Sequence, residues 1–363
     1  MIWILTGLLA LTALYVLLLL ALAYGLGQRT ASSDAGQRRV TVMVAAHNEA
    51  DRIDACLNAL ALQTYPPELT QVVVVDDRSQ DDTYQVASSW QDRIPGLRVI
   101  RVEEPVLACP KKNALNQGIK VATGEIVLTT DADCTPSPEW IASTASCFSD
   151  GVGAVIGPAP LTDSGGRLSP LLLFQAMLVN ALAAGSAGIG LPLTCSGRNF
   201  AFRKSAFDDV DGYTPIGHIL GGDDVLLMRR IASAGWPVVY NHDNAAAVRS
   251  PAHLDRQWSR QIRYQSKARH YGLPILSLAM LIYIFHLLLL AGPVIAWLAP
   301  STTPILWAVL IAKAAADGVF LFRAARRLQQ RRMLRWFPLV ECLAIPYIAV
   351  FCALGTLRSP TWT

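Results

Sequence analysis

The sequence is poor in charge and lacks the common phosphate-binding motifs. Charged residues make up 16% of its 363 positions and apolar residues 52%, where ~25% charge is usual in globular domains. No GxGxxG follows the first expected strand and no GxxxxGK(S/T) occurs, so a dehydrogenase or P-loop enzyme would lack its phosphate-binding loop. The central region has no Lys/Arg run and the net charge is +4, which argues against a nucleic-acid partner.

The cysteines also lack a pattern. There are seven, scattered along the chain and never spaced as CxxC. This arrangement predicts neither a zinc site nor a disulfide framework, and it favours reduced thiols in the cytosol.

The apolar surplus is concentrated at the two ends of the chain. Ile2–Leu26 is long enough to cross ~30 Å of hydrocarbon, and without a basic start it is predicted to be an uncleaved anchor. Three further spans are expected at Ile275–Leu298, Ile305–Phe322 and Phe337–Leu357. We therefore expect an anchor in residues 1–28, a soluble domain in 38–272 and a membrane region of about three helices in 273–363.

Basic residues predict the orientation of these spans. The loop between the last two carries Arg323, Arg326, Arg327, Arg331, Arg332 and Arg335, and the first span is followed by Arg29, Arg38 and Arg39. Both groups should face the cytoplasm. The sequence thus predicts a multi-pass protein of the cell membrane whose soluble domain is cytoplasmic.

Pro170–Leu193 is a further apolar segment, inside the soluble region. As a span it would place the acidic motifs before and after it on opposite sides of the bilayer. We expect a helix lying in the interface (residues 170–193) or packed under the domain, with a buried core helix as the alternative. The Gly185–Gly190 stretch is expected to break a continuous helix.

Charged residues also occur inside the predicted spans. Lys313 and Asp317 are one helical turn apart and should neutralise each other. Glu341 has no obvious partner in the sequence.

The soluble region alternates short apolar runs with helical periodicity. Strands are expected at Val40–Ala45, Gln71–Val75, Leu97–Val102 and Glu125–Thr130, with helices at Asp82–Trp90 and Lys111–Ala122 and around Ile53, Leu57 and Leu60. This pattern predicts an α/β fold with a mostly parallel sheet and helices on both faces. Ligands bind such sheets at the carboxyl ends of strands, where His47–Glu49, Asp76–Asp77 and Asp131–Asp133 follow three of them.

Asp131 and Asp133 suggest a metal site. In extended chain, residues two apart point to the same face, and two carboxylates so placed repel each other unless a cation lies between them. Mg²⁺ or Mn²⁺, completed by substrate phosphates, fits this arrangement. A solvated turn is the alternative.

Three other sets of residues leave alternatives open. Arg260 and Arg263, one turn apart, could bind a diphosphate bidentately, or they could belong to a basic helix at the headgroup surface. One residue of Asp223–Asp224 could cap the helix that follows. The histidines at positions 218, 242 and 253 match no metal-ligand spacing and are interpreted as ordinary hydrogen-bonded side chains.

Taken in order, these motifs resemble the inverting glycosyltransferases of family 2, which have the Rossmann-like nucleotide-binding fold called GT-A. The resemblance covers residues 40–265. Its motifs are Val44–Glu49, Val75–Ser79 with Asp81 and Thr83, Lys111 with Ala114–Asn116, Thr130–Asp133, Gly197–Asn199 with Arg203, Gly222–Asp224, and Arg260, Arg263 and Tyr264. The family usually has Glu-Asp where this chain has Asp223–Asp224, and QxxRW where this chain has Arg260 and Tyr264.

The resemblance implies a role for each residue. Glu49 and Asp77 would hold the nucleoside, Lys111 the donor phosphate, and Asp131 the ribose or the metal, while Lys112 would be a solvated neighbour. Asp133 would bind Mg²⁺ or Mn²⁺, and Asp224 would be the general base, with Asp223 structural or orienting. Arg260, Arg263 and Tyr264 would also contact the nucleotide-sugar, and Gly197, Arg198 and Asn199 would lie near the acceptor or the donor sugar.

The resulting prediction is metal-dependent, inverting transfer of a sugar from a UDP- or GDP-linked donor. The acceptor would be a lipid or another hydrophobic membrane molecule at the cytoplasmic face. Three alternatives remain: a processive polysaccharide synthase, which would need more spans; a sugar-nucleotide pyrophosphorylase, which would need a Gly-rich basic start; and an inactive membrane scaffold.

Overall fold

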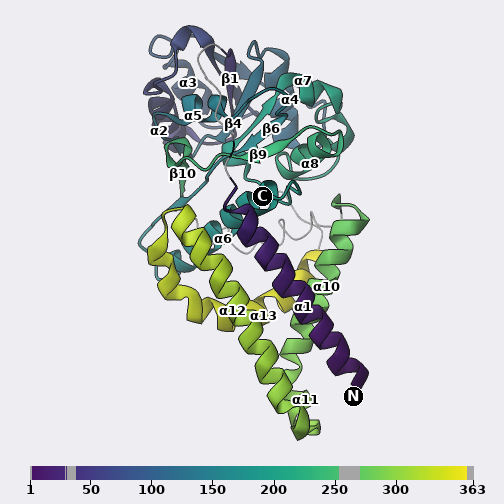
Figure 1. The fold of residues 1–363 in the computed structure, drawn as a ribbon. Coiled ribbons are helices and arrows are strands. Elements are labelled where there is room, and N and C mark those ends of the chain that lie inside the picture. The colour runs from purple at the N-terminus through teal and green to yellow at the C-terminus, as the bar shows by residue number, and fades with distance from the viewer. Residues whose placement is uncertain (1, 29, 31–37, 253–269, 358–363) are drawn as a thin grey trace.

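A computed structural model of the chain describes residues 2–28, 30, 38–252 and 270–357. An α/β domain lies above a group of long helices, with the first helix beside the C-terminal ones (Figure 1). The long helices come from both ends of the sequence, as the distribution of apolar residues predicts.

The domain is built on a seven-stranded sheet in the order β3-β2-β1-β4-β8-β6-β9. Its strands are β1 Val40–Ala46, β2 Thr70–Asp76, β3 Leu97–Arg101, β4 Ile126–Asp131, β6 Ala154–Ile156, β8 Phe200–Arg203 and β9 Val238–Tyr240. Only β8 among them is antiparallel to its neighbours. The central strands are apolar and buried on both faces, which requires helices on each side.

Helices cover both faces of this sheet. One face carries α2 Ala50–Ala61, α3 Thr83–Ser88 and α5 Trp140–Ser146, and the other carries α4 Pro110–Lys120, α6 Ser169–Gly188, α7 Lys204–Asp209 and α8 Val225–Ser233. A second sheet, in the order β5-β10-β7, contains β5 Thr135–Pro136, β10 Val248–Pro251 and β7 Leu161–Thr162. The α/β fold with a mostly parallel sheet is therefore confirmed.

Helix α6 joins the domain to the long helices. It packs against β9 on one side and against α1 (Ile2–Gly25) on another, and one continuous apolar core extends from the sheet through α6 to α1. The helix ends at Gly188, inside the Gly185–Gly190 stretch that was expected to break it. Gly185 permits close packing, because a Cβ there would lie 2.7 Å from the backbone oxygen of Leu22 in α1.

Five helices among the described residues are long and apolar enough to span a membrane, α1 and α6 included. The C-terminal elements are α10 Leu273–Leu290, α11 Gly292–Leu298, α12 Thr303–Arg327, the 3-10 helix η7 Arg331–Trp336 and α13 Phe337–Leu357. Ile275–Leu298, predicted as one span, divides into α10 and α11. The division falls beside Pro293, which has no N–H for a helical hydrogen bond.

The charges inside the long helices form one cluster. Lys313 is 1% exposed and its Nζ lies 2.8 Å from Asp317 Oδ2, as expected, and 2.7 Å from Glu341 Oε1. The interpretation that Glu341 lacks a partner is therefore wrong: α13 brings it onto α12. Tyr15 of α1 donates its hydroxyl to Asp317 Oδ1, so the cluster links three helices.

Candidate active site

The polar residues that follow the central strands lie at one edge of the sheet. Ala46 of β1 pairs with Asp76 of β2, and Ala45 pairs with Asp131 of β4. The carboxyl ends of these strands are thus side by side, which is where ligands bind in parallel α/β sheets.

The loops after β1 and β2 hold each other in place. Asn48 has φ +53°, a left-handed conformation that Asn tolerates. Its backbone N–H donates to Ser79 Oγ at 3.0 Å, and its side-chain oxygen accepts from the Gln80 N–H at 2.8 Å. This interlock positions Glu49, whose N–H donates to Thr83 Oγ1, beside the turn that carries Asp77.

Asp76 and Asp77 have different environments. Asp76 is fully buried and accepts from Arg101 Nε at 3.0 Å, which makes it part of the framework. Asp77 pairs with Arg78 Nε at 2.9 Å, and its backbone oxygen lies 2.7 Å from His47 Nδ1. Of the two, Asp77 lies beside the Glu49 loop, and its role at the nucleoside remains a prediction.

Lys111 connects the two acidic motifs. Its Nζ lies 2.6 Å from Asp131 Oδ1 and 3.3 Å from Asp223 Oδ2. Burial alone would lower the pKa of Lys111, but the carboxylates of Asp131, Asp223 and Asp224 hold that pKa well above its ordinary value. Lys111 is therefore protonated at neutral pH and provides a fixed positive charge.

The same contacts show how α6 lies relative to the acidic residues before and after it in the sequence. Asp131 precedes α6 in the sequence and Asp223 follows it, yet both touch one ammonium group. A membrane crossing by α6 would have separated them. Helix α6 is therefore packed under the domain, as one of the sequence-based interpretations proposed.

Asp131 and Asp133 form a candidate cation site. Their carboxylate oxygens and the Cys134 Sγ all lie within 4.8 Å of one another. Both carboxylates are partly exposed, whereas Cys134 is fully buried. Two carboxylates open on one side fit a hard divalent ion that keeps positions for substrate oxygens.

Asp224 is fixed by two backbone groups. Its Oδ2 accepts from the Gly197 N–H at 2.7 Å, and its Oδ1 accepts from the Val225 N–H at 2.7 Å as the N-cap of α8. The sequence left open which of Asp223 and Asp224 caps this helix, and the cap falls on Asp224; the catalytic role of Asp224 and the structural or orienting role of Asp223 remain predictions. Asp223 contacts Lys111. A carboxylate has about four acceptor positions, so Asp224 retains acceptor capacity towards a substrate.

The Gly197–Asn199 segment, η2, borders this site, and each of its three residues makes different contacts. Gly197 lies against both acids: a Cβ there would be 3.1 Å from Asp223 Oδ2. Arg198 donates to the Ala159 oxygen and to Ser250 Oγ, and so ties η2 to the second sheet. Asn199 is 1% exposed, and its amide donates to the Pro158 and Ala246 oxygens, so its side chain supports the site from within the core.

Lys112 is the residue that the sequence interpretation placed wrongly. It is fully buried, and its Nζ donates to the backbone oxygens of Ile216 and Ile219 at 2.8 Å each. It is therefore not a solvated neighbour but the support for the loop that leads to Asp223. The helical periodicity of the sequence indicates that Lys112 is buried, because Lys112 shares a face with the buried Leu115 and Ile119.

Tyr271 and His242 lie where the α/β domain meets the long helices. Tyr271, just before α10, packs its ring 4.8 Å from the Arg229 guanidinium of α8. Burial, and then the nearby Asp224 carboxylate, raise the pKa of Tyr271. His242 accepts from Arg327 Nε at 3.2 Å, and burial followed by that arginine lowers the pKa of His242 to about 4, which agrees with an ordinary hydrogen-bonded histidine.

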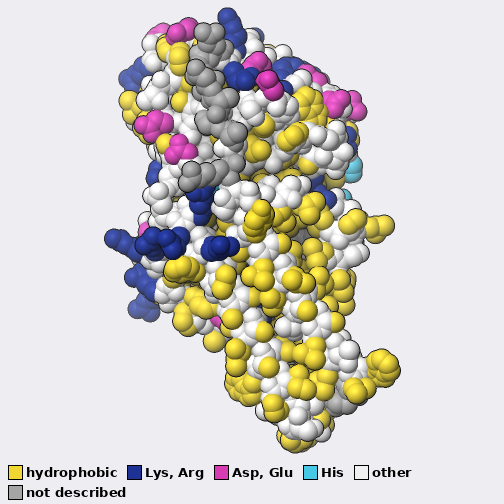
Figure 2. Space-filling view, viewed as in Figure 1, with side chains coloured by type: hydrophobic (Ala, Val, Ile, Leu, Met, Phe, Trp, Pro, Cys, Tyr) yellow, Lys and Arg dark blue, Asp and Glu magenta, His cyan; other side chains and the backbone are white. Residues whose placement is uncertain are grey.

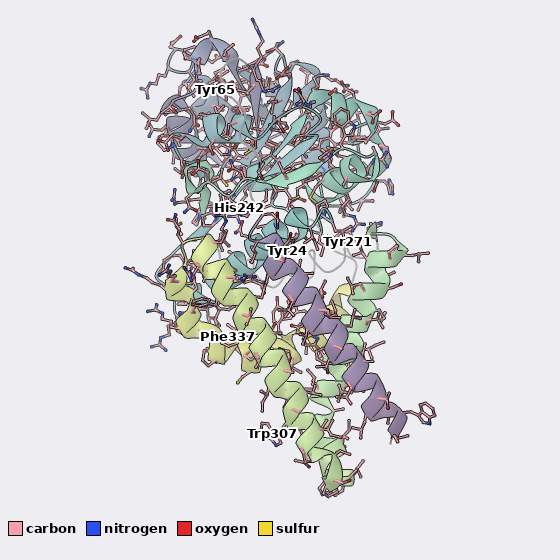
Figure 3. The ribbon with its side chains drawn as sticks, viewed as in Figure 1. Tyr24, Tyr65, His242, Tyr271, Trp307 and Phe337 are labelled. Atoms are coloured by element: carbon pink, nitrogen blue, oxygen red, sulfur yellow. The ribbon has the colours of Figure 1, made fainter. Side chains whose placement is uncertain are left out.

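The predicted contacts of Arg260, Arg263 and Tyr264 lie outside the described residues. Tyr271 precedes α10, at the end of that helix that faces the domain (Figure 3). The chain therefore passes from the candidate site directly into the long helices.

The model of the family "Glycosyl transferase family 2" matches residues 41–211. Residues 41–211 are therefore a glycosyltransferase family 2 domain. The match contains every strand of the large sheet except β9, together with the cation-site residues.

Similar proteins agree with this assignment. The chain is 29% identical over 209 residues to the glycosyltransferase AglE of Haloferax volcanii, covering 56% of this chain and 64% of that protein. It is 26% identical over 229 residues to the poly-beta-1,6-N-acetyl-D-glucosamine synthase of Staphylococcus aureus, and the match covers 62% of this chain and 53% of that protein. The matched part thus spans between about half and two thirds of these relatives' length.

A solved structure has the same fold over nearly the whole chain. The mannosyltransferase PcManGT from Pyrobaculum calidifontis, in complex with GDP-Man and Mn²⁺, is 23% identical, with a TM-score of 0.61, and the match covers 98% of this chain and 99% of that one. The likeness therefore includes the long helices as well as the GT-A domain.

Proposed function

We propose that the chain transfers a sugar from a nucleotide-sugar donor to a lipid or other hydrophobic membrane acceptor, with inversion at the anomeric carbon. The observation that carries this proposal is the contact of Lys111 with both Asp131 and Asp223. It joins the donor-side acids to Asp224, the predicted base, in one site.

On the donor side, Glu49 and Asp77 would accept hydrogen bonds from the nucleoside, and Asp131 and Asp133 would hold a divalent cation. Such an ion would neutralise charge on the departing nucleoside diphosphate. Lys111 is protonated and fixed at the same place, so it would add a second positive charge beside the diphosphate. The PcManGT structure contains Mn²⁺ and GDP-Man, which supports this assignment.

On the acceptor side, Asp224 would take the proton of the attacking hydroxyl. The hydroxyl oxygen would then bond to the anomeric carbon as the bond from that carbon to the diphosphate oxygen breaks. The N–H groups of Gly197 and Val225 would hold the Asp224 carboxylate in a fixed orientation throughout. Asp223 would keep Lys111 between the two halves of the site.

A hydrophobic acceptor is supported by the surroundings of Asp224. Tyr271 packs on Arg229 of α8, the helix that Asp224 caps, and Leu273 begins a helix long and apolar enough to span a membrane. Arg323 and Arg327 contact the oxygen of Ala23 and the ring of His242, so the basic loop lies on the side of the domain. By the positive-inside tendency, that side would be the cytoplasm.

A processive polysaccharide synthase remains the second candidate, because relatives at 26% identity carry that name. The two functions differ in their products. A single-transfer enzyme yields a lipid carrying one added sugar, whereas a synthase yields a ladder of lengths.

The test uses membranes containing the full chain, incubated with UDP- and GDP-sugars and then extracted with organic solvent. Mass spectrometry should find a lipid one sugar heavier. Asp224→Asn should lose transfer by roughly 10²-fold or more while retaining donor binding, and Asp133→Ala should lose metal-dependent donor binding. Asp208→Asn is the control, since Asp208 is exposed and pairs only locally with Lys204. Full transfer by Asp224→Asn would remove it as the base, and product confined to the aqueous phase would refute a lipid acceptor.

A further inference from the structure

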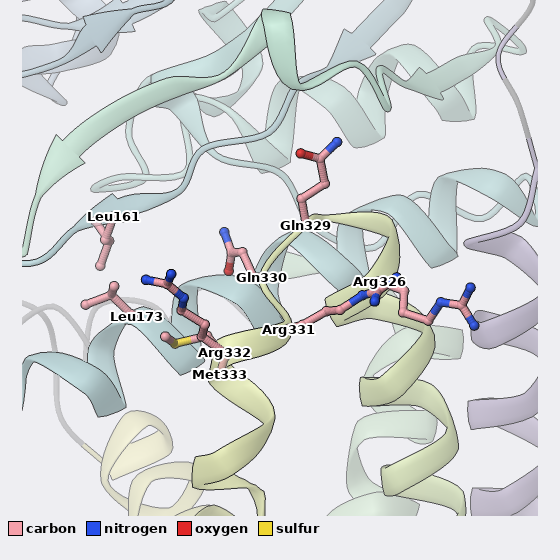
Figure 4. A pocket seen from close by; sticks show the side chains of 8 residues that line it. All are labelled: Leu161, Leu173, Arg326, Gln329, Gln330, Arg331, Arg332 and Met333. Atoms are coloured by element: carbon pink, nitrogen blue, oxygen red, sulfur yellow. The ribbon is translucent and has the colours of Figure 1, made fainter.

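A cavity lies where the α/β domain meets the turn between α12 and α13 (Figure 4). Its volume is about 600 Å³. Residues from four separate elements line it, among them Leu161 of β7, Leu173 of α6, Arg326 at the end of α12, and Arg331, Arg332 and Met333 of η7. No carboxylate is among the described lining residues.

The three arginines of this cavity differ in their contacts from the neighbouring arginines Arg323 and Arg327. Arg323 and Arg327 hold the turn in place through the contacts given above. None of the ion pairs formed among residues 2–28, 38–252 and 270–357 includes Arg326, Arg331 or Arg332. Among the described residues, no carboxylate therefore pairs with the three arginines beside this cavity.

The cavity also has an apolar side. Leu161, Leu173 and Met333 line it together with the arginines. An inorganic anion would gain nothing from these three side chains. A ligand that carries both an anionic group and hydrocarbon would use both parts of the lining.

The position of the cavity agrees with a ligand from the membrane. Arg327 ends one candidate span and Arg331 begins the next, so η7 lies at the level where the spans leave the hydrocarbon. Lys and Arg side chains gather at the boundary between the mixed surface of the domain and the hydrophobic surface of the long helices (Figure 2). Basic pockets at this level attract lipids with anionic headgroups.

The cavity is close to the candidate active site but separate from it. Strand β5 begins two residues after Asp133, and β10 lies between β5 and β7, the strand that carries Leu161. Strands β5 and β7 are therefore two strand spacings apart, which is roughly 10 Å. A lipid held in the cavity would therefore sit beside the catalytic cleft without occupying the donor site.

We propose that this cavity binds the phosphate group of a membrane lipid. Arg332, whose guanidinium lies on the same side of the turn as Leu161 and Leu173 (Figure 4), binds the phosphate oxygens, for which the planar guanidinium fork is suited, and Arg326 and Arg331 add positive charge at the other side of the cavity. The hydrocarbon next to the headgroup packs against Leu161, Leu173 and Met333. Binding requires no sugar transfer, so this site and the proposed function stand or fall separately.

A basic turn can also attract anionic lipids diffusely, without a pocket, and three variants distinguish this case from binding in the cavity. Arg331→Gln/Arg332→Gln removes two charges that line the cavity, and Arg335→Gln removes a charge from the same helix outside the lining. Leu173→Trp places a larger side chain in the apolar part of the cavity and leaves the net charge unchanged.

The experiment measures lipid binding to the full-length protein in detergent by native mass spectrometry. Titrants are phosphatidic acid, phosphatidylglycerol, phosphatidylcholine and, separately, inorganic phosphate. We expect phosphatidic acid or phosphatidylglycerol to bind more tightly than phosphatidylcholine, and Arg331→Gln/Arg332→Gln to weaken that binding roughly tenfold or more. Leu173→Trp should also weaken it, and Arg335→Gln should have little effect.

Three results would overturn the proposal. Equal losses in Arg335→Gln and the double variant would show diffuse attraction, as would undiminished binding by a folded Leu173→Trp protein. Binding of inorganic phosphate as tight as that of the lipids would show a site for free phosphate. Donor binding and the unfolding temperature, measured on each variant, establish that the proteins are folded.

Discussion

Replacing Lys112 with methionine removes the ammonium group that supports the loop leading into Asp223 and Asp224. In the native protein this group is fully buried and donates to the Ile216 and Ile219 oxygens at 2.8 Å each. Methionine is of similar length and uncharged, so the cavity stays filled while both hydrogen bonds are lost.

The expected change in stability is modest because two effects oppose each other. A hydrogen bond from a charged donor contributes about 1.5–3 kcal/mol, so two of them contribute about 3–6 kcal/mol. Burying an ammonium group costs several kcal/mol in return. The net loss should be roughly 0–3 kcal/mol, or less than about 12 °C in unfolding temperature.

The expected change in activity is larger than the change in stability. The freed carbonyls let the loop shift, and a displacement of about 1 Å at catalytic groups can cost roughly 10²-fold in rate. The loss should appear in kcat, with little change in the KM for the donor, because Lys111 remains beside Asp131. This split distinguishes a positioning role from direct contact with the donor.

The assay compares transfer in membranes with thermal unfolding in detergent. Lys120→Met is the matched control, since Lys120 is exposed on the same helix. Native transfer by a folded Lys112→Met protein would refute the positioning role, and so would a loss that appears only in the KM for the donor.

Three further changes test the framework by thermal unfolding. Gly185→Val places side-chain atoms against the backbone of Leu22 and should cost about 1–3 kcal/mol; an unchanged unfolding temperature would contradict the close helix contact. Because burial, then Arg327, lowers the pKa of His242 to about 4, the unfolded state binds the extra proton, and stability should fall as the pH drops from about 6.5 towards 4, by at most about 1.4 kcal/mol per pH unit. His242→Asn should remove that part of the decline. Identical declines in the native and variant proteins would exclude a contribution of His242 to the pH dependence of stability. Lys313→Met leaves two carboxylates without their cation and should cost about 3 kcal/mol or more, whereas native stability would show that the cluster contributes little.

Local sequence patterns were sufficient to predict the sheet and the acidic residues that follow its strands. Apolar runs such as Gln71–Val75 have few alternatives to a buried strand, and the polar residues directly after them must then lie at the carboxyl edge. The structure places Asp76 and Asp131 on either side of the end of β1, as that reasoning requires.

Features that depend on tertiary contacts could not be predicted in the same way. The partner of Glu341 is on another helix, 28 positions away, and no sequence spacing indicates it. The packing of α1 against Gly185 is also a tertiary contact, and the low helix propensity of glycine does not indicate it. Asp224 and Asp223 are neighbours with equal chemistry, so only backbone geometry shows which of them caps α8.

Cryo-electron microscopy of the full-length protein in a lipid nanodisc, with a nucleotide-sugar and Mn²⁺, would examine the proposed site directly. We expect one ion about 2–2.3 Å from an Asp133 oxygen, further bound by diphosphate oxygens, with Asp224 facing the anomeric carbon in the same cleft. An ion bound elsewhere, or a bilayer crossing by α6 that separates Asp131 from Asp224, would contradict the proposed enzyme.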